Sequence, residues 1–151
     1  MQIVIVCRNC GAKNRVDETR LATSEAKCGR CGEKLEVSND AKPLVITDQT
    51  FEREVLAAQG KPVLVDCWAP WCGPCRIVGP IMDQLAAESQ GQYRIAKLNV
   101  DDNPQVASRF QIGSIPTMLI FKDGKLIDRL VGAQPKPAIA ERLRLASRFA
   151  A

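Results

Sequence analysis

The sequence contains no histidine among its 151 residues. Imidazole is the side chain that most often gains and loses protons near neutral pH, and it is a common metal ligand. Its absence excludes a Cys–His catalytic dyad, an imidazole zinc ligand and an imidazole proton shuttle. Any acid–base chemistry must therefore fall to carboxylates, lysines and thiols.

Long apolar runs and blocks of like charge are also missing. No apolar stretch approaches the roughly 20 residues of a membrane-spanning helix. The opening run 1–6 has no basic segment before it and no small-residue cleavage site after it. Basic residues only slightly outnumber acidic ones in both 1–40 and 41–151, which gives nucleic acid binding little support. We expect a cytoplasmic, monomeric protein that binds neither membranes nor nucleic acid.

Seven cysteines are present, in three Cys-x-x-Cys pairs and one single residue. The cytosol keeps ordinary thiols reduced, so cysteines in a chain without secretory features favour metal binding or catalysis over structural disulfides. The pairs are Cys7 with Cys10, Cys28 with Cys31, and Cys72 with Cys75, and the single residue is Cys67.

The sequence of residues 1–40 predicts a small metal-binding module. The polar segment 38–43 at its end is expected to contain the linker to the rest of the chain. The pairs Cys7/Cys10 and Cys28/Cys31 have the spacing of a four-thiolate structural zinc site. Such a site leaves no open coordination position, so one zinc ion would organise the fold and would not catalyse. A segment of this size buries too little apolar surface to be stable alone, whereas zinc binding supplies on the order of 10 kcal/mol.

Other interpretations of these four cysteines stay open. They could form two regulatory disulfides or redox-active pairs. The site could act as an oxidation sensor, in which zinc is released while the thiols join in disulfides. A zinc ribbon can also dock partner proteins, which would make the chain a redox-sensing recruitment module.

Residues 43–151 alternate between strand and helix patterns, which predicts an α/β domain. Asp123-Gly124 is a hairpin signal between the last two strands. The closing helix is expected to bury Ile139, Leu143, Leu145 and Phe149. Strands are expected at 44–46, 63–68, 93–100, 117–121 and 125–131, and helices at 50–58, 72–89, 103–110 and 136–149.

The pair Cys72/Cys75 falls where an apolar strand gives way to a helix. Unpaired backbone N–H groups and the helix dipole stabilise a thiolate at such a position, so its pKa falls below the free value of about 8.5. Thiolate is the species that attacks disulfides.

Several ordered segments of residues 43–149 resemble the thioredoxin family, namely VDCWAPWCGPC at 65–75, AKLNVD at 96–101, IPT at 115–117 and FKDG at 121–124. The cysteine-bearing extension is similar to that of the bacterial thioredoxin 2 subgroup. The resemblance implies a thioredoxin fold, with a central mixed β-sheet flanked by helices, joined to a zinc-ribbon-like module. It also implies a protein-disulfide reductase that takes electrons from thioredoxin reductase, passes them to disulfide-containing client proteins and uses no organic cofactor.

The resemblance also implies roles for single residues. Cys72, first in the helix and more exposed, would attack the substrate disulfide, and Cys75 would then resolve the mixed disulfide. Asp66 would be a buried carboxylate with a raised pKa that takes the proton from Cys75, and Lys97 would tune it. The alternatives are an outward-facing acid for Asp66 and a solvated strand lysine for Lys97.

The resemblance places a substrate surface around the cysteine pair. A cis peptide bond before Pro116 would leave the Ile115 backbone able to pair with an extended substrate segment. Gly73 and Pro74 would restrain the turn between the cysteines. An apolar rim would be formed by Trp71, Ile115, Gly132 and Ala133.

Two residues depart from the common family pattern. Cys67 stands where a large aromatic residue is usual, and Arg76 replaces a lysine but keeps its charge. We interpret Cys67 as a small buried hydrophobe, with a third redox thiol as the alternative.

Overall fold

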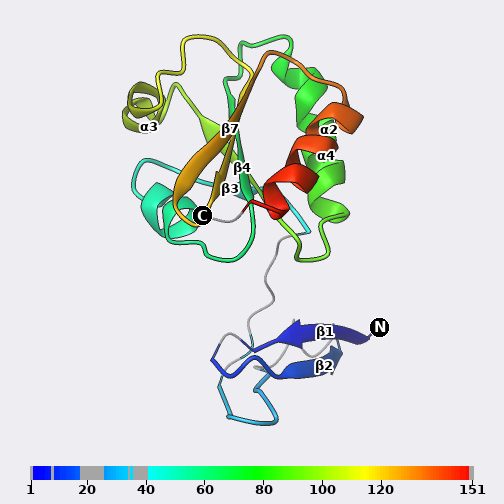
Figure 1. Cartoon of the computed structure of the whole chain (residues 1–151). Helices are drawn as coiled ribbons and strands as arrows, with labels where there is room; N and C mark the ends of the chain where they lie inside the picture. Colours follow the sequence, from blue (N-terminus) through cyan, green and yellow to red (C-terminus); the bar gives the residue numbers. More distant parts are fainter. Residues whose placement is uncertain (1, 8, 18–25, 34, 36–40, 150–151) are drawn as a thin grey trace. The chain divides into compact units, whose positions relative to one another are not determined.

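The computed structural model of the chain describes residues 2–7, 9–17, 26–33, 35 and 41–149 (Figure 1). It divides into two units, Met1–Asn39 and Asp40–Ala151. Part of the predicted linker, residues 38–40, lies outside the described residues. None of the helices in the described ranges is long and apolar enough to cross a membrane.

The N-terminal unit is built on two antiparallel strands, β1 (Gln2–Val6) and β2 (Lys13–Asp17). Alternate residues of β1 point to opposite faces, so Ile5 is buried while Val4 and Val6 are exposed. A strand in the opening apolar run was not predicted. Among the described residues of this unit, the core contains Ile5, Val16 and Leu35 together with cysteines and alanines.

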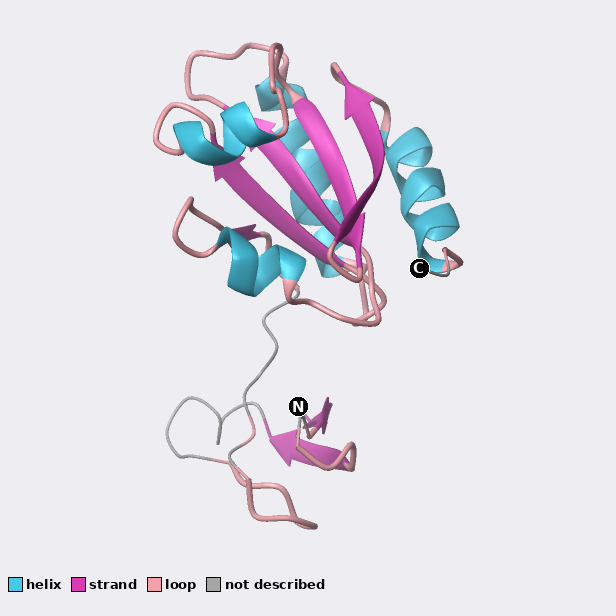
Figure 2. Cartoon of the chain, turned by 60° about the vertical axis from the view of Figure 1, so that its left-hand side comes forward, coloured by secondary structure: helices cyan, strands magenta, loops and turns pink. Residues whose placement is uncertain are grey.

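A five-stranded mixed sheet forms the centre of the second unit (Figure 2). The strand order is β3-β5-β4-β6-β7. The first three strands in this order are parallel, and β6 and β7 run antiparallel to their neighbours. The strands are β3 (Leu44–Val45), β4 (Val63–Trp68), β5 (Arg94–Asn99), β6 (Thr117–Lys122) and β7 (Lys125–Val131).

Helices cover both faces of this sheet (Figures 1 and 2). On one face, Val78 and Met82 of α2 (Cys75–Ala87) pack in one cluster with Ile139 of α4 (Lys136–Ser147). On the other face, a second cluster joins the sheet to η1 (Glu52–Leu56) and α3 (Pro104–Arg109). This arrangement confirms the predicted α/β class and the thioredoxin fold.

Strand β4 sends alternate side chains to the two apolar clusters. Val65 and Cys67 pack on the η1 and α3 side, whereas Leu64 packs under α2 and α4. Because side chains alternate along a strand, Asp66 shares the face of Leu64. The same parity on β5 places Lys97 on this face, and the two residues are register partners.

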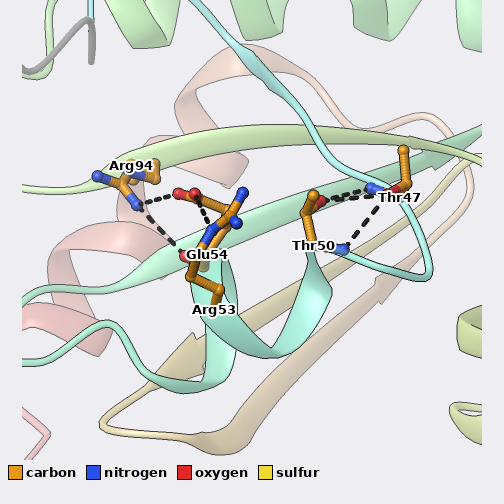
Figure 3. Close-up of polar contacts among 5 residues, drawn as sticks. All are labelled: Thr47, Thr50, Arg53, Glu54 and Arg94. Atoms are coloured by element: carbon orange, nitrogen blue, oxygen red, sulfur yellow. Dashed lines mark hydrogen bonds and ion pairs between the residues drawn. The ribbon is translucent and has the colours of Figure 1, made fainter.

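The segment η1 is a short π-helix where an α-helix over 50–58 was expected. The N–H of Ala57 donates to the carbonyl of Glu52 at 2.8 Å, which is the i→i−5 pattern. At its start, the N–H of Thr47 donates to Thr50 Oγ1 at 2.9 Å and the N–H of Thr50 donates to Thr47 Oγ1 at 3.3 Å (Figure 3). Near its end, Arg94 donates to the carbonyl and to a carboxylate oxygen of Glu54, both at 3.3 Å, which ties η1 to β5.

The buried side of α4 differs from the prediction. Ile139 and Leu143 are buried as expected, but Leu145 and Phe149 are exposed and Ala146 is buried instead. Positions 139, 143 and 146 follow at the helical spacing of i, i+4 and i+7, so they form one stripe against the sheet.

Candidate active site and metal-binding cluster

Cys72 and Cys75 are joined by a disulfide at the point where β4 leads into α2. The helix begins at Cys75, with Pro74 at its N-cap, so Cys72 lies in the preceding turn and is not the first helical residue. The N–H of Cys75, which has no partner within the helix because it belongs to the first turn, donates to Cys72 Sγ at 3.2 Å. Cys72 is 3% exposed and Cys75 is 6% exposed, so the expected greater exposure of Cys72 is absent from the oxidised form.

Asp66 is buried beside the disulfide. Its exposed fraction is 2%, and its Oδ1 atom has no hydrogen-bond partner among the described residues. Burial raises the pKa of Asp66 from 3.8 to about 7, against an opposing effect from the charge of Lys97. The alternative of an outward-facing acid is therefore wrong.

A pocket of about 370 Å³ connects Asp66 with the cysteine pair. Lys97 also lines it, 3.8 Å from Asp83 Oδ1. The lining residues on α2 include Cys75, Gly79 and Asp83, which follow at four-residue steps on one side of the helix. That spacing was readable in the sequence, yet Asp83 was not singled out. The full lining is Asp66, Trp68, Ala69, Pro70, Cys72, Cys75, Arg76, Gly79, Pro80, Asp83 and Lys97.

The residues of the predicted substrate surface come from three segments. Trp71 is 70% exposed, and its Nε1 donates to Asp101 Oδ2 at 2.9 Å. The Ile115–Pro116 peptide bond is cis, and the carbonyl of Pro116 accepts from the N–H of Gly132 at 2.8 Å. Gly132 has φ +86°, in the region that favours glycine. Ile115 is half-buried and precedes Thr117, the first paired residue of β6.

The remaining predicted surface residues, Gly73, Pro74 and Ala133, are exposed. Ile77 and Val131 are exposed as well, and the sequence did not predict this, because nothing in it distinguishes an exposed aliphatic residue from a core residue.

Cys67 lies on the sheet face away from Asp66. It is fully buried in the cluster under η1 and α3. Burial, with a smaller contribution from the charge of Asp66, raises the pKa of its thiol to about 12. The thiol stays protonated and shielded, which confirms the interpretation of Cys67 as a small buried hydrophobe.

Four cysteines converge in the N-terminal unit, and their sulfur atoms all lie within 4.8 Å of one another. The sulfurs of Cys7 and Cys31 are 3.6 Å apart, as are those of Cys10 and Cys28. A disulfide needs about 2.05 Å, whereas four sulfurs about 2.3 Å from a central metal ion are separated by about 3.8 Å. The four residues are free cysteines in a geometry that fits a tetrahedral metal ion.

The two cysteine loops have the same backbone structure. The N–H of Gly11 donates to the carbonyl of Cys7, and that of Gly32 donates to the carbonyl of Cys28, each at 2.9 Å. Gly11 and Gly32 have φ of +76° and +77°, which residues with a Cβ rarely adopt. The Cys-x-x-Cys-Gly pattern therefore folds twice into a tight turn that directs both sulfurs to one point.

Hydrogen bonds to the sulfur of Cys28 stabilise its thiolate form. Its sulfur accepts from the N–H of Arg30 at 3.4 Å and from Asn14 Nδ2 at 3.5 Å. Backbone N–H groups of Cys31 and Arg30 lower the pKa of Cys28 to about 6. Thiolate is the form that binds metal.

Known families match both parts of the chain. A family model described as "Thioredoxin" matches residues 42–144, and one described as "Thioredoxin 2, N-terminal" matches residues 6–33. "Thioredoxin 1" of Nostoc sp. is 52% identical over 98 residues, which are 65% of this chain and 91% of the relative. "Thioredoxin 2" of Chlorobaculum tepidum is 54% identical over 97 residues, 64% of this chain and 88% of the relative.

The redox-active cysteine pair, the fold around it and these similarities agree with one another. The chain belongs to the thioredoxin family of thiol–disulfide oxidoreductases.

Proposed function

We propose that this protein reduces disulfides of client proteins through Cys72 and Cys75, with Asp66 as the proton acceptor and one structural zinc in the N-terminal unit. The observation that supports this most strongly is the buried carboxylate of Asp66, whose Oδ1 has no hydrogen-bond partner among the described residues, in the same pocket as the cysteine pair. Buried carboxyl groups with strongly shifted pKa values are concentrated at functional sites.

In the first step, the thiolate of reduced Cys72 attacks one sulfur of the client disulfide. A bond forms between Cys72 and that sulfur, the client S–S bond breaks, and the other client sulfur leaves as a thiolate. The N–H of Cys75 at 3.2 Å from Cys72 Sγ supports this role, because a backbone donor stabilises the attacking thiolate.

In the second step, Cys75 gives its proton to Asp66 and attacks the sulfur of Cys72. The Cys72–Cys75 disulfide forms, and the client departs with both electrons as a second thiolate. A general base works best when its pKa is near the working pH, and the pKa of Asp66 is about 7. We assign Lys97 the role of tuning this pKa through its charge.

Client proteins would dock on the exposed surface around Cys72. Trp71 and Ile115 would contribute apolar contacts, together with Gly132, while the main chain before Pro116 would pair with an extended client segment. Gly73 and Pro74 would hold the turn that keeps Cys72 at this surface. Main-chain pairing tolerates many client sequences.

We assign the metal of the N-terminal cluster to zinc, held by Cys7, Cys10, Cys28 and Cys31. Bound zinc would supply a closed four-thiolate centre that orders the fold, with no open position for catalysis. The small aliphatic core of this unit supports a dependence on the metal. The corresponding division is a zinc module at 1–40 and a thioredoxin domain at 43–151.

Thioredoxins as a family work with a reductase and with disulfide-bearing clients. For this chain we propose a thioredoxin reductase as the electron donor and the cytoplasm as the compartment, with the protein acting as a monomer without nucleic acid or membrane partners. The near-balanced charge supports the absence of a nucleic acid partner, and cysteines left as free thiols suit a reducing compartment.

An insulin disulfide reduction assay on the full chain tests the catalytic assignment. Cys72→Ser should abolish turnover, because zinc would hold the four cysteines of the N-terminal unit and Cys67 is buried. Cys67→Ala is the matched control: it removes a buried thiol outside the pocket and should retain activity. Turnover that persists in Cys72→Ser would reject the proposed mechanism.

A further inference from the structure

Lys97 reaches across the pocket to helix α2. Its Nζ lies 3.8 Å from Asp83 Oδ1. A Cβ placed on Gly79 would lie 3.9 Å from the same nitrogen, so the lysine amine rests above the helix at its least bulky residue. Gly79 and Asp83 are four residues apart and line the same side of the pocket.

Register alone would favour a different partner for Lys97. Asp66 is its neighbour on β4, and both side chains lie on the face covered by α2. Nevertheless, Asp66 Oδ1 has no hydrogen-bond partner within the described part of the chain. The ion pair that Lys97 forms is with the helix and not with the adjacent strand.

Hydration of the ammonium explains why Lys97 pairs with Asp83 and not with Asp66. The side chains of Lys97 and Asp83 are 25% and 65% exposed, so the ammonium keeps part of its water shell at Asp83. Contact with the buried carboxylate of Asp66 would remove that water, and removing water from an ammonium is costly. The exposed carboxylate on α2 therefore offers the lysine a less costly site.

We infer that Asp83 is a positioning residue, which holds the ammonium of Lys97 at the pocket mouth and thereby keeps Asp66 able to receive the Cys75 proton at neutral pH. The inference rests on the proposed function, because it deepens the role assigned there to Asp66. Without Asp83, the ammonium turns toward Asp66 and stabilises its carboxylate, and that carboxylate becomes a weaker base.

The charges around Asp66 support this positioning role. Its register partner on β6, Met118, carries no charge, so the opposing effect of Lys97 acts on a group that is otherwise governed by burial. The titratable and charged groups that face Asp66 in the pocket are Lys97 from β5, Cys72 from the turn, and Cys75, Arg76 and Asp83 from α2.

A carbon NMR titration of the Asp66 carboxyl group in the oxidised full-length protein tests the inference. In this form Cys72 and Cys75 are bonded and do not titrate. The Asp66 signal is assigned by its loss in Asp66→Asn. Asp83→Asn should lower the titration midpoint by about 1 pH unit, the lower end of the effect of a nearby cation on an aspartate. Asp83→Glu should restore the midpoint.

The lysine separates positioning from simple charge repulsion. In a Lys97→Gln background, Asp83→Asn should shift the midpoint much less, because only the direct effect of the lost negative charge remains. Glu141→Gln removes a paired carboxylate of α4 outside the pocket and should not move the midpoint. Equal shifts with and without Lys97, or no shift at all, would overturn the inference.

A rate measurement distinguishes failure of this inference from failure of the proposed function. Reduced protein reacts with an aromatic disulfide reagent at Cys72, and the second release of coloured thiolate reports the attack of Cys75. In Asp83→Asn, the pH profile of this release should move with the NMR midpoint. A moved midpoint with an unmoved profile would reject the proton role of Asp66 and leave the positioning intact. Slow release of the second thiolate in Asp66→Asn, with an unshifted midpoint in Asp83→Asn, would reject the positioning role of Asp83 and leave the proton role of Asp66 intact.

Discussion

The buried carboxyl group of Asp66 should make stability fall as pH rises. Burial raises its pKa from 3.8 to about 7, and a tenfold change in proton affinity corresponds to about 1.4 kcal/mol. Below pH 3.8 the group is neutral in both folded and unfolded chains, so it costs nothing. Between 3.8 and about 7 the folded chain holds a proton that the unfolded chain has lost, so stability declines, by about 4 kcal/mol in total.

Substitution of Asp66 by asparagine removes this ionisation. We compare the free energy of unfolding of Asp66→Asn with that of the wild type. The advantage of the variant should be about 3 kcal/mol larger at pH 9 than at pH 5. Urea unfolding of the oxidised protein, followed by tryptophan fluorescence, measures the difference. Both tryptophans, Trp68 and Trp71, lie in the unit 40–151, so the signal reports on that unit alone.

Glu141→Gln supplies a control of opposite sign. The hydrogen bond from Arg144 lowers the pKa of Glu141 from 4.5, so its contribution to stability is present above that pH and is lost only as pH falls further. Its effect should therefore stay constant between pH 5 and pH 9. An identical dependence on pH in the wild type and in Asp66→Asn would refute the assignment of a buried, ionising carboxyl group.

Three further predictions concern the turn at Gly124, the exposed Trp71 and the metal cluster. Gly124 has φ +81°, and a Cβ there would lie 3.0 Å from the carbonyl oxygen of Leu56, so Gly124→Ala should lower the free energy of unfolding by about 1–3 kcal/mol in urea titrations. Gly60→Ala, with φ +85° and open space around it, should cost less, and an equal cost would contradict a steric origin. Trp71→Ala should raise KM for a protein disulfide several-fold and leave the rate with a small disulfide reagent nearly unchanged. The control variant Phe149→Ala, which changes another exposed aromatic residue, should alter neither quantity. An unchanged KM in Trp71→Ala would remove this residue from the client surface. Elemental analysis should find one zinc per chain, and mild oxidation should remove only two of the seven thiols counted after denaturation with a chelator; a loss of six thiols would instead identify the cluster as redox-active.

The strands of the second unit and the cysteine pairs could be predicted because short-range patterns determine them. Pro62 directly precedes the apolar run of β4, and Pro70 lies in the turn that follows it. The predicted limits of this strand, 63–68, match the structure. The burial of Asp66 followed from the apolar residues on both sides of it and from the family resemblance. The convergence of four sulfurs followed from the repeated Cys-x-x-Cys spacing.

The features that could not be predicted depend on contacts between distant segments. The sheet surface under α4 determines which side of the helix is buried, so that Leu145 is exposed and Ala146 is buried. The sequence of the helix alone does not determine this orientation. The ion pair of Lys97 with Asp83 depends on which of two carboxylates keeps the ammonium hydrated. The π-helical turn of η1 is tied to Arg94, 40 residues from Glu54 along the chain.

Trapping the mixed disulfide tests most directly whether Cys72 starts the exchange and Cys75 completes it. Single variants Cys72→Ser and Cys75→Ser are reduced, mixed with a disulfide-bearing protein and analysed by non-reducing mass spectrometry. We expect a stable adduct through Cys72 in Cys75→Ser and none in Cys72→Ser, because only the sulfur beside the first N–H groups of α2 starts the exchange. Adducts of equal yield in the two variants would contradict this assignment of roles.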